Sequence, residues 1–370
     1  MVYDPALVTR DGSTACELSH PPPRPPADTD GPDGPDMAFG LRDVVLNQVR
    51  GAWRDYGYDL DDQCTTAPEF LSDCRPPAGS NAPLDGPGGL DNSFGESLYP
   101  LVASAVGDLE ATARAAQHAG RGLPVLIIRG WNGQRTDPRI DISITQAVFG
   151  TPGGPDDTAP PEVVIESPTS RHFPGGAEVP PPAWDGNDWF WVRSDSFVGG
   201  DLDRPLIRDD NAYVVDGTFV ITLPSRIDIV FPADEVGVLV RLTGARATGQ
   251  LTEDGLTMER STVAGRWAIA DLLYTAENVG VCEGTAEYRV LDDALERIAD
   301  VRSDPSTGGM GLECDAISIG VGFTARRIRV AALTEGPPLG NVCASRTDGG
   351  MMSSDAGVPA DAGGGMDSGR

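Results

Sequence analysis

The chain has 370 residues, enough for one large domain or two modest ones, and its formal net charge at pH 7 is −28. All 28 basic residues are Arg, against 56 acidic residues. Because nucleic acids and anionic membrane surfaces are themselves polyanions, this charge excludes both as partners. No run of apolar residues approaches the roughly 20 that a membrane-spanning helix needs, so no membrane span is expected.

Both ends of the chain are predicted to be disordered. Residues 1–36 contain "HPPPRPPADTDGPDGPD", a polyproline run followed by an acidic run broken by glycine, and neither part can bury a core. Residues 346–370 have low complexity and are rich in Gly, Asp and Ala. We therefore predict a linker at 1–36, a single β-rich globular domain at 37–345 and a disordered tail at 346–370.

The first part of the predicted domain mixes helix and strand. Residues 39–53 fit either a helix or a strand, and the pattern does not decide between them. Apolar residues recur at helical spacing over 96–119, and Gly120 stands where a C-terminal cap belongs. The run "PVLIIRG" at 124–130 indicates a strand.

Most of the remainder has the alternating pattern of β-strands. Strands are predicted near 189–193, 213–221, 227–231, 236–242 and 317–323, and helices near 266–277 and 290–302. The strands do not alternate regularly with helices, so a doubly wound parallel sheet is not expected. The pattern predicts a mainly β fold, an antiparallel β-sandwich-like domain with about three packed helices and disordered termini.

Six cysteines indicate disulfides and an oxidising compartment, because no pair has the Cys-x-x-Cys spacing of a metal or redox site. Proximity along the chain favours Cys64–Cys74 and Cys282–Cys314, which leaves Cys16 to pair with Cys343. The protein is therefore expected to be extracytoplasmic: secreted, periplasmic or surface-anchored. The start "MVYDPALVTRDG" is not a signal peptide, so a leader is expected to be missing from this chain.

Catalytic motifs are missing from the sequence. It has no Gly-x-Ser-x-Gly, no His-Glu-x-x-His, no phosphate loop and no dinucleotide fingerprint. The three histidines, His20, His118 and His172, lie in unpromising surroundings for a triad or a zinc site. We therefore do not expect an enzyme of a motif-bearing class. Catalysis by two carboxylates stays open, because 56 acidic residues offer many pairs.

Two acidic, glycine-bent loops indicate a calcium site. The strings "DYGYDLDDQC" and "DGPGGLDN" gather the hard oxygen ligands that Ca²⁺ prefers, although neither fits an EF-hand. The alternative is that these side chains form Asx-turns and cap their own backbone. The candidate metal ligands are Asp59, Asp61, Asp62, Asp85, Asp91 and Asn92.

An aromatic segment, "PAWDGNDWFWVRSD", indicates a second candidate site. Flat aromatic faces beside amide and carboxylate groups are how proteins hold sugar rings. The alternative is a core strand preceded by a turn, in which Trp189 and Trp191 share one side and Phe190 takes the other. The candidate ligand-binding residues are Trp184, Asp185, Asn187, Asp188, Trp189 and Trp191.

Several strings together resemble a family of secreted or lipid-anchored proteins of myxobacteria and their relatives. They are "GYDLDDQCT", "DGPGGLDNSFG", "AWDGNDWFW", "GVCEGTAEY" and "CDAISIGVGF", and the resemblance covers most of residues 37–345. It implies an exported location, a preceding leader and a Cys282–Cys314 pairing. It implies no activity and no functional residues.

The function expected from these features is that of a cell-surface or periplasmic binding protein. It would be stabilised by calcium and would recognise carbohydrate or another cell-surface ligand. One alternative is a carboxylate-dependent polysaccharide hydrolase, and another is a structural envelope protein without a ligand.

Overall fold

The structure is a computed structural model of the chain. It describes residues 18–29, 31–65, 73–77, 80, 83–151, 164–165, 171–172, 174–233, 236–335 and 342–343.

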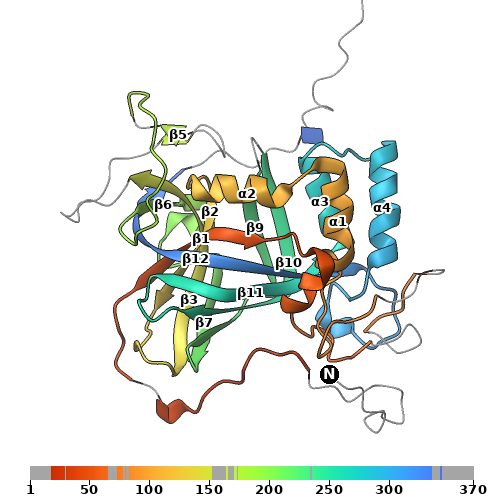
Figure 1. Ribbon diagram of the computed structural model, residues 1–370, viewed down its shortest axis with the longest axis horizontal. Helices are drawn as coiled ribbons and strands as arrows, with labels where there is room; N and C mark the ends of the chain where they lie inside the picture. Colours follow the sequence, from red (N-terminus) through yellow and green to blue (C-terminus); the bar gives the residue numbers. More distant parts are fainter. Residues whose placement is uncertain are drawn as a thin grey trace, which may run out of the picture.

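Eight strands of the described chain form a closed antiparallel barrel (Figure 1). Each strand pairs with the next in the order β1-β2-β3-β7-β8-β10-β11-β12, and β12 pairs with β1 to close the ring. The strands are β1 (Met37–Val45), β2 (Leu123–Arg129), β3 (Asp137–Thr151), β7 (Ile207–Val215), β8 (Thr218–Thr222), β10 (Val236–Leu251), β11 (Thr257–Ala268) and β12 (Ala316–Thr334).

The predicted β-sandwich is therefore wrong, although the mainly β composition is confirmed. A strand that buries one face alternates apolar and polar residues in a sandwich and in a barrel alike, so the pattern cannot separate the two folds. What separates them is the register between strands far apart in sequence, such as Ala38 opposite Ile328.

Two further strands lie outside the ring because the long strands extend beyond it. β6 (Trp189–Arg193) pairs antiparallel with the end of β3 and parallel with the end of β12. β9 (Arg226–Ala233) pairs with the first half of β10. A short separate ladder joins β4 (Val164–Ile165) to β5 (Arg171–His172).

Helices pack at one end and across the top of the barrel in the view of Figure 1. The predicted helix at 96–119 is broken by Gly107, whose φ of 89° ends one helix before Asp108 caps the next. The expected helices near 266–277 and 290–302 correspond to α3 and α4. The helices are η4 (Phe94–Leu98), α1 (Tyr99–Val106), α2 (Leu109–His118), α3 (Ile269–Asn278) and α4 (Ala286–Ile298), with short turns η2 (Ala27–Thr29), η3 (Val49–Asp55), η5 (Ser194–Ser196), η6 (Val198–Gly200) and η7 (Pro305–Thr307). The undecided segment 39–53 thus forms the strand β1 followed by the turn η3.

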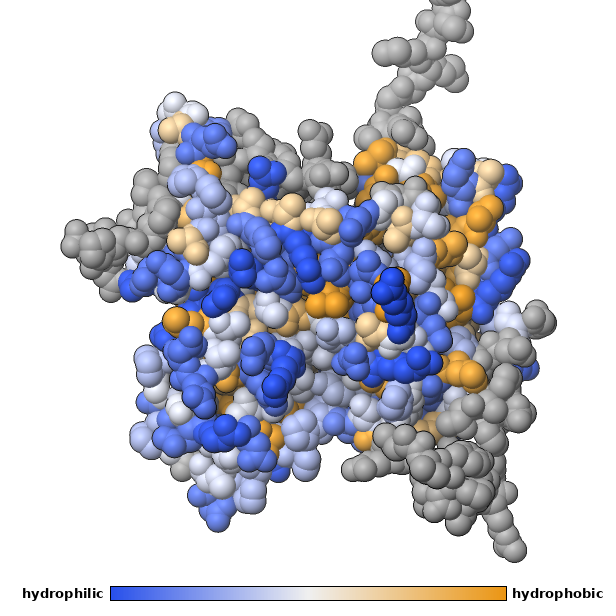
Figure 2. All heavy atoms as spheres, viewed as in Figure 1, coloured by the Kyte–Doolittle hydropathy of each residue, from blue (hydrophilic) through white to orange (hydrophobic). Residues whose placement is uncertain are grey.

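Two large apolar cores hold the fold together, with a small third cluster around the Cys74–Cys314 disulfide. The main core fills the barrel and includes Phe39, Ile142 and Phe219. The second core includes Phe149 and Phe190 and lies among β1, β2, β3, β6 and β12, which form a second closed circuit of paired strands. Outside the cores, hydrophilic residues cover most of the face shown in Figure 2, while apolar colour gathers over the helices at the right.

The disulfides join segments that are distant in the sequence. Cys74 pairs with Cys314, and Cys282 pairs with Cys343, with Cα atoms 5.1 and 5.4 Å apart. The predicted pairings Cys64–Cys74, Cys282–Cys314 and Cys16–Cys343 are therefore wrong, because the folded chain brings partners together irrespective of their spacing. Cys64 is also disulfide-bonded, and Cys16 lies outside the described residues. Disulfides fit an extracytoplasmic protein. No helix in the described ranges is long and apolar enough to cross a membrane.

Candidate metal centre

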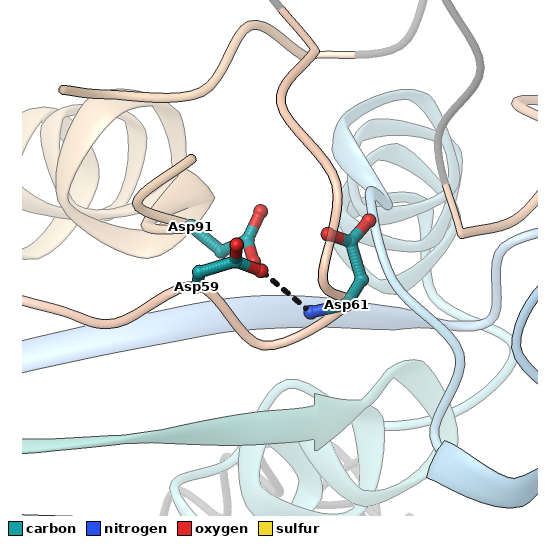
Figure 3. A group of neighbouring side chains, drawn as sticks. All are labelled: Asp59, Asp61 and Asp91. Carbon is teal, nitrogen blue, oxygen red and sulfur yellow. Dashed lines mark hydrogen bonds between the residues drawn. The ribbon is translucent and has the colours of Figure 1, made fainter. Parts of the chain in front are cut away.

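Three carboxylates from two loops meet beside the barrel (Figure 3). Asp59 and Asp61 lie on the loop that follows η3, and Asp91 lies just before η4. Backbone pairing between Tyr58 and Asp91, with Asp91 N donating to Tyr58 O at 3.0 Å, joins the two loops. One carboxylate oxygen from each of the three residues lies within 4.8 Å of the others. The two segments of the predicted calcium site are thus brought together.

Asp59 forms the Asx-turn expected as the alternative, but with only one of its oxygens. Its Oδ1 accepts hydrogen bonds from the backbone N–H of Asp61 at 3.1 Å and of Asp62 at 2.7 Å. Its Oδ2 is buried and has no hydrogen-bond partner among the described residues. The side chain of Asp59 is 1% exposed, and Figure 3 shows its carboxylate directed toward that of Asp91. An unpartnered buried carboxylate oxygen is costly unless a proton or a cation compensates it.

Gly89 leaves space for this oxygen. Its φ of +70° favours glycine, and a Cβ at this position would overlap the carbonyl oxygen of Gln63 and lie 3.0 Å from Asp59 Oδ2. The Gln63 carbonyl oxygen and Asp59 Oδ2 therefore both lie close to Gly89. The lining consists of hard oxygen atoms, and the neighbouring Cys64 is disulfide-bonded and so offers no thiolate.

The electrostatics of the cluster favour any positive charge placed in it. Burial and the neighbouring Asp61 carboxylate raise the pKa of Asp59 to about 7. Burial and the charges of Asp61, Asp300 and Asp59 raise the pKa of Asp85 to about 8. Burial and nearby carboxylates also raise the pKa of Asp91 well above its ordinary value. These carboxyl groups therefore hold protons near neutral pH unless a cation replaces them.

The remaining predicted ligands have other roles. Asp62 is exposed and lies 3.4 Å from the His20 ring nitrogen. Asn92 is buried and fully engaged: it donates to the backbone oxygens of Trp53 and Tyr56, and its Oδ1 accepts from Gly95 N and Gly320 N. It therefore holds the loop in place.

Asp85 and two unpredicted residues surround the three carboxylates. Asp85 Oδ2 accepts from Thr65 N at 2.5 Å, and its charge acts on the cluster. Asp300, whose pKa burial raises to about 6, accepts from Ser318 N at 2.7 Å. Burial raises the pKa of Asp61, and the charge of Arg266, which donates to Leu60 O, offsets only part of that rise. Asp300 and Arg266 lie more than 170 residues away in sequence, and no local pattern marks them.

The aromatic segment is divided between a turn and a strand. Asp188 is buried and accepts from the backbone N–H of Ala183 and Trp184, so it builds the turn. The Trp184 indole donates to His118 O at 3.1 Å, and its ring packs beside Phe190 in the second core. This arrangement matches the core-and-turn alternative at these positions.

The other two tryptophans alternate with the core residues of β6. Phe190 and Val192 are fully buried, while Trp189 and Trp191 are half-buried between them. The Arg329 guanidinium lies over the Trp189 ring, 5.5 Å from its centre, and donates to Asn187 Oδ1 at 3.0 Å. Asp185, which is exposed, caps the turn by accepting from Asn187 N. Trp184 and Trp191 both pack against the second core, and sugar binding by this segment stays a prediction.

Comparison with protein-family models, with curated proteins and with solved structures found no match. The resemblance to the myxobacterial family therefore stays a prediction, and the function is inferred from the geometry of the site.

Proposed function

We propose that this protein is an extracytoplasmic calcium-binding protein, in which Asp59, Asp61 and Asp91 hold a Ca²⁺ ion that fixes two loops to the barrel. The observation that carries the proposal is the buried Asp59 Oδ2, which has no partner in the described chain, on a carboxylate that has one oxygen within 4.8 Å of an oxygen of Asp61 and of Asp91. A divalent cation would supply the partner that Asp59 Oδ2 lacks and would offset the charge of all three carboxylates, although Asp61 and Asp91 already accept backbone hydrogen bonds.

The donor set favours calcium over other common metals. Ca²⁺ takes six to eight oxygen ligands in flexible geometry, whereas Mg²⁺ demands a near-ideal octahedron and Zn²⁺ prefers Cys and His ligands. The three carboxylates come from irregular loops, and the Gln63 carbonyl oxygen lies with Asp59 Oδ2 beside Gly89. Such loops adapt to a large ion more readily than to a small one.

The burial of the clustered carboxylates argues against their use in the alternative function, polysaccharide hydrolysis. A polysaccharide hydrolase needs two carboxylates that face a cleft open to a polymer. Asp59 and Asp91 are only 1% and 3% exposed, so a sugar chain cannot reach them. The same burial suits a cation that stabilises the fold.

Calcium titration of the oxidised full-length protein, by calorimetry and by thermal melting, tests the proposal. After exhaustive treatment with EDTA, we expect one Ca²⁺ to bind per chain. Saturation at 100 times the dissociation constant should raise the free energy of unfolding by about 2.7 kcal/mol. For a domain of about 300 residues that corresponds to a rise in melting temperature of about 4 °C.

The Asp62→Asn variant is the matched control, because Asp62 lies on the same loop but is exposed. It should keep the full calcium response, and magnesium should produce a smaller one in both proteins. A wild-type protein that binds no calcium and melts identically in calcium and in EDTA would refute the proposal.

A further inference from the structure

The N-terminal segment that precedes the barrel is attached to the loops of the metal centre. We call residues 18–29 and 31–36 the strap. It runs along the lower side of the barrel and then rises to β1 (Figure 1). These residues belong to the predicted linker, yet in the structure they contact the barrel at several points.

The first attachment joins the strap to both metal-centre loops through one residue. Ser19 N donates to Gly88 O at 2.7 Å, and Ser19 O accepts from Asp59 N at 2.9 Å. Gly88 precedes Asp91 on one loop, and Asp59 is a proposed ligand on the other. The next residue, His20, lies 3.4 Å from Asp62 on the same loop. Any ion that fixes the two loops therefore also fixes the partners of Ser19.

The second attachment lies on the wall of the barrel, away from the metal centre. The Tyr213 hydroxyl of β7 donates to Pro22 O at 2.6 Å. The Arg24 guanidinium lies over the Tyr213 ring, 4.4 Å from its centre, and donates to the backbone oxygens of Pro138 in β3 and Asn211 in β7. An aromatic ring flanked by carbonyl oxygens is a fitting receptor for an arginine in a proline-rich segment.

The third attachment fastens the end of the strap before β1. Gly34 N donates to Trp131 O at 2.8 Å, and the Trp131 ring packs edge-on against Phe219 of the main core. Between these points the strap buries little apolar surface. Among its described residues before η2, Pro25 is buried and the others are half-buried or exposed. Segments with few buried contacts open locally at low free energy.

We propose that calcium at the metal centre keeps the strap docked on the wall around Tyr213, and that loss of calcium releases the strap and uncovers this receptor surface. The inference rests on the proposed calcium site. Ion binding and strap docking share the Asp59 loop, so each must favour the other by the same factor. The occupant of the Tyr213 surface is the chain's own Pro22–Arg24 segment.

Hydrogen exchange measured by mass spectrometry on the oxidised full-length protein, together with calcium calorimetry, tests this coupling. We expect the amides of residues 19–29 to exchange about tenfold faster in EDTA than in calcium, because local opening becomes easier. The Arg24→Ala variant loses the barrel-wall attachment without touching the metal loops. Reciprocity predicts that its calcium affinity falls by about fivefold or more.

Arg139→Ala is the matched control. Arg139 follows Pro138 in β3 and donates to Asp210 O, beside the strap but not to it, so its removal should leave the calcium affinity within about twofold of wild type. If the wild type binds no calcium, both the proposed calcium site and its coupling to the strap are refuted. If calcium binds but strap exchange is unchanged and Arg24→Ala equals Arg139→Ala, the coupling alone is overturned.

Discussion

Replacing Asp59 by Asn should change the stability of the protein in opposite directions with and without calcium. The amide keeps an Oδ1 that can accept from the N–H groups of Asp61 and Asp62. It replaces the unpartnered Oδ2 by an N–H donor beside Asp91. The substitution thus keeps the turn, removes a buried negative charge and removes a metal ligand.

The gain in the metal-free protein follows from the pKa of Asp59. Raising the pKa from 3.8 to about 7 corresponds to about 4 kcal/mol at about 1.36 kcal/mol per pKa unit. Screening and relaxation reduce this to about 2 kcal/mol. At pH 8 the carboxyl group is ionised in both the folded and the unfolded chain, so the folded wild type carries this full cost. In EDTA at pH 8, Asp59→Asn should therefore be more stable by about 2 kcal/mol.

Calcium should reverse the order. At 1,000 times the dissociation constant, the ion stabilises the wild type by about 4 kcal/mol, and the variant gains little. The wild type then exceeds the variant by about 2 kcal/mol, the difference between the two effects. Urea unfolding at pH 8, followed by circular dichroism in EDTA and in calcium, measures both differences. A variant destabilised equally in both buffers would show that Asp59 only caps its loop, and Asp62→Asn should show no reversal.

Three further predictions concern the pH dependence of stability, the glycine beside the metal centre and one disulfide. In EDTA the melting temperature should fall as pH rises from about 4 to 8. Over this window the folded chain keeps a proton on Asp85, whose pKa is raised from 3.8 to about 8, while the unfolded chain has already lost it. A flat or rising profile would contradict the raised pKa. Gly89→Ala should abolish the calcium response, since its Cβ would overlap Gln63 O in a left-handed backbone; an unchanged titration would remove that glycine from the site. Replacing Cys74 and Cys314 by Ser opens a loop of 240 residues and should lower the free energy of unfolding by about 5 kcal/mol in the chain-entropy model. Urea unfolding measures this difference, and a decrease below about 1 kcal/mol would show that this disulfide contributes little to stability.

The strands were largely predictable because burial of one face imposes alternation. The expected strands at 227–231 and 317–323 correspond to β9 and part of β12. β3 carries an equally clear signal, the alternation of Ile140, Ile142 and Ile144, which was not among the expected strands. Ring closure was not predictable, since it depends on pairing between residues of β1 and β12 that lie 277 to 290 positions apart, from Val45 with Gly322 to Ala38 with Ile328.

The metal centre was predictable in part, because loops rich in Asp and Gly mark oxygen-lined turns. Asp59, Asp61 and Asp91 do come together, yet the adjacent Asp62 points to solvent and Asn92 holds the backbone. Neighbouring side chains on an irregular loop point in different directions. Because a loop has no regular repeat, the sequence does not indicate which of them point into the cluster. Asp300 reaches the cluster only through the fold.

The strand β12 links the unfolding of the two apolar cores. This strand of 19 residues pairs with β1, β6 and β11, so it belongs to both closed circuits and contributes to both cores. Loss of β12 would therefore open both rings and expose both cores at once. Heat or denaturant should therefore melt the barrel and its outer layer in one cooperative transition, with the N-terminal strap as a separable, earlier step.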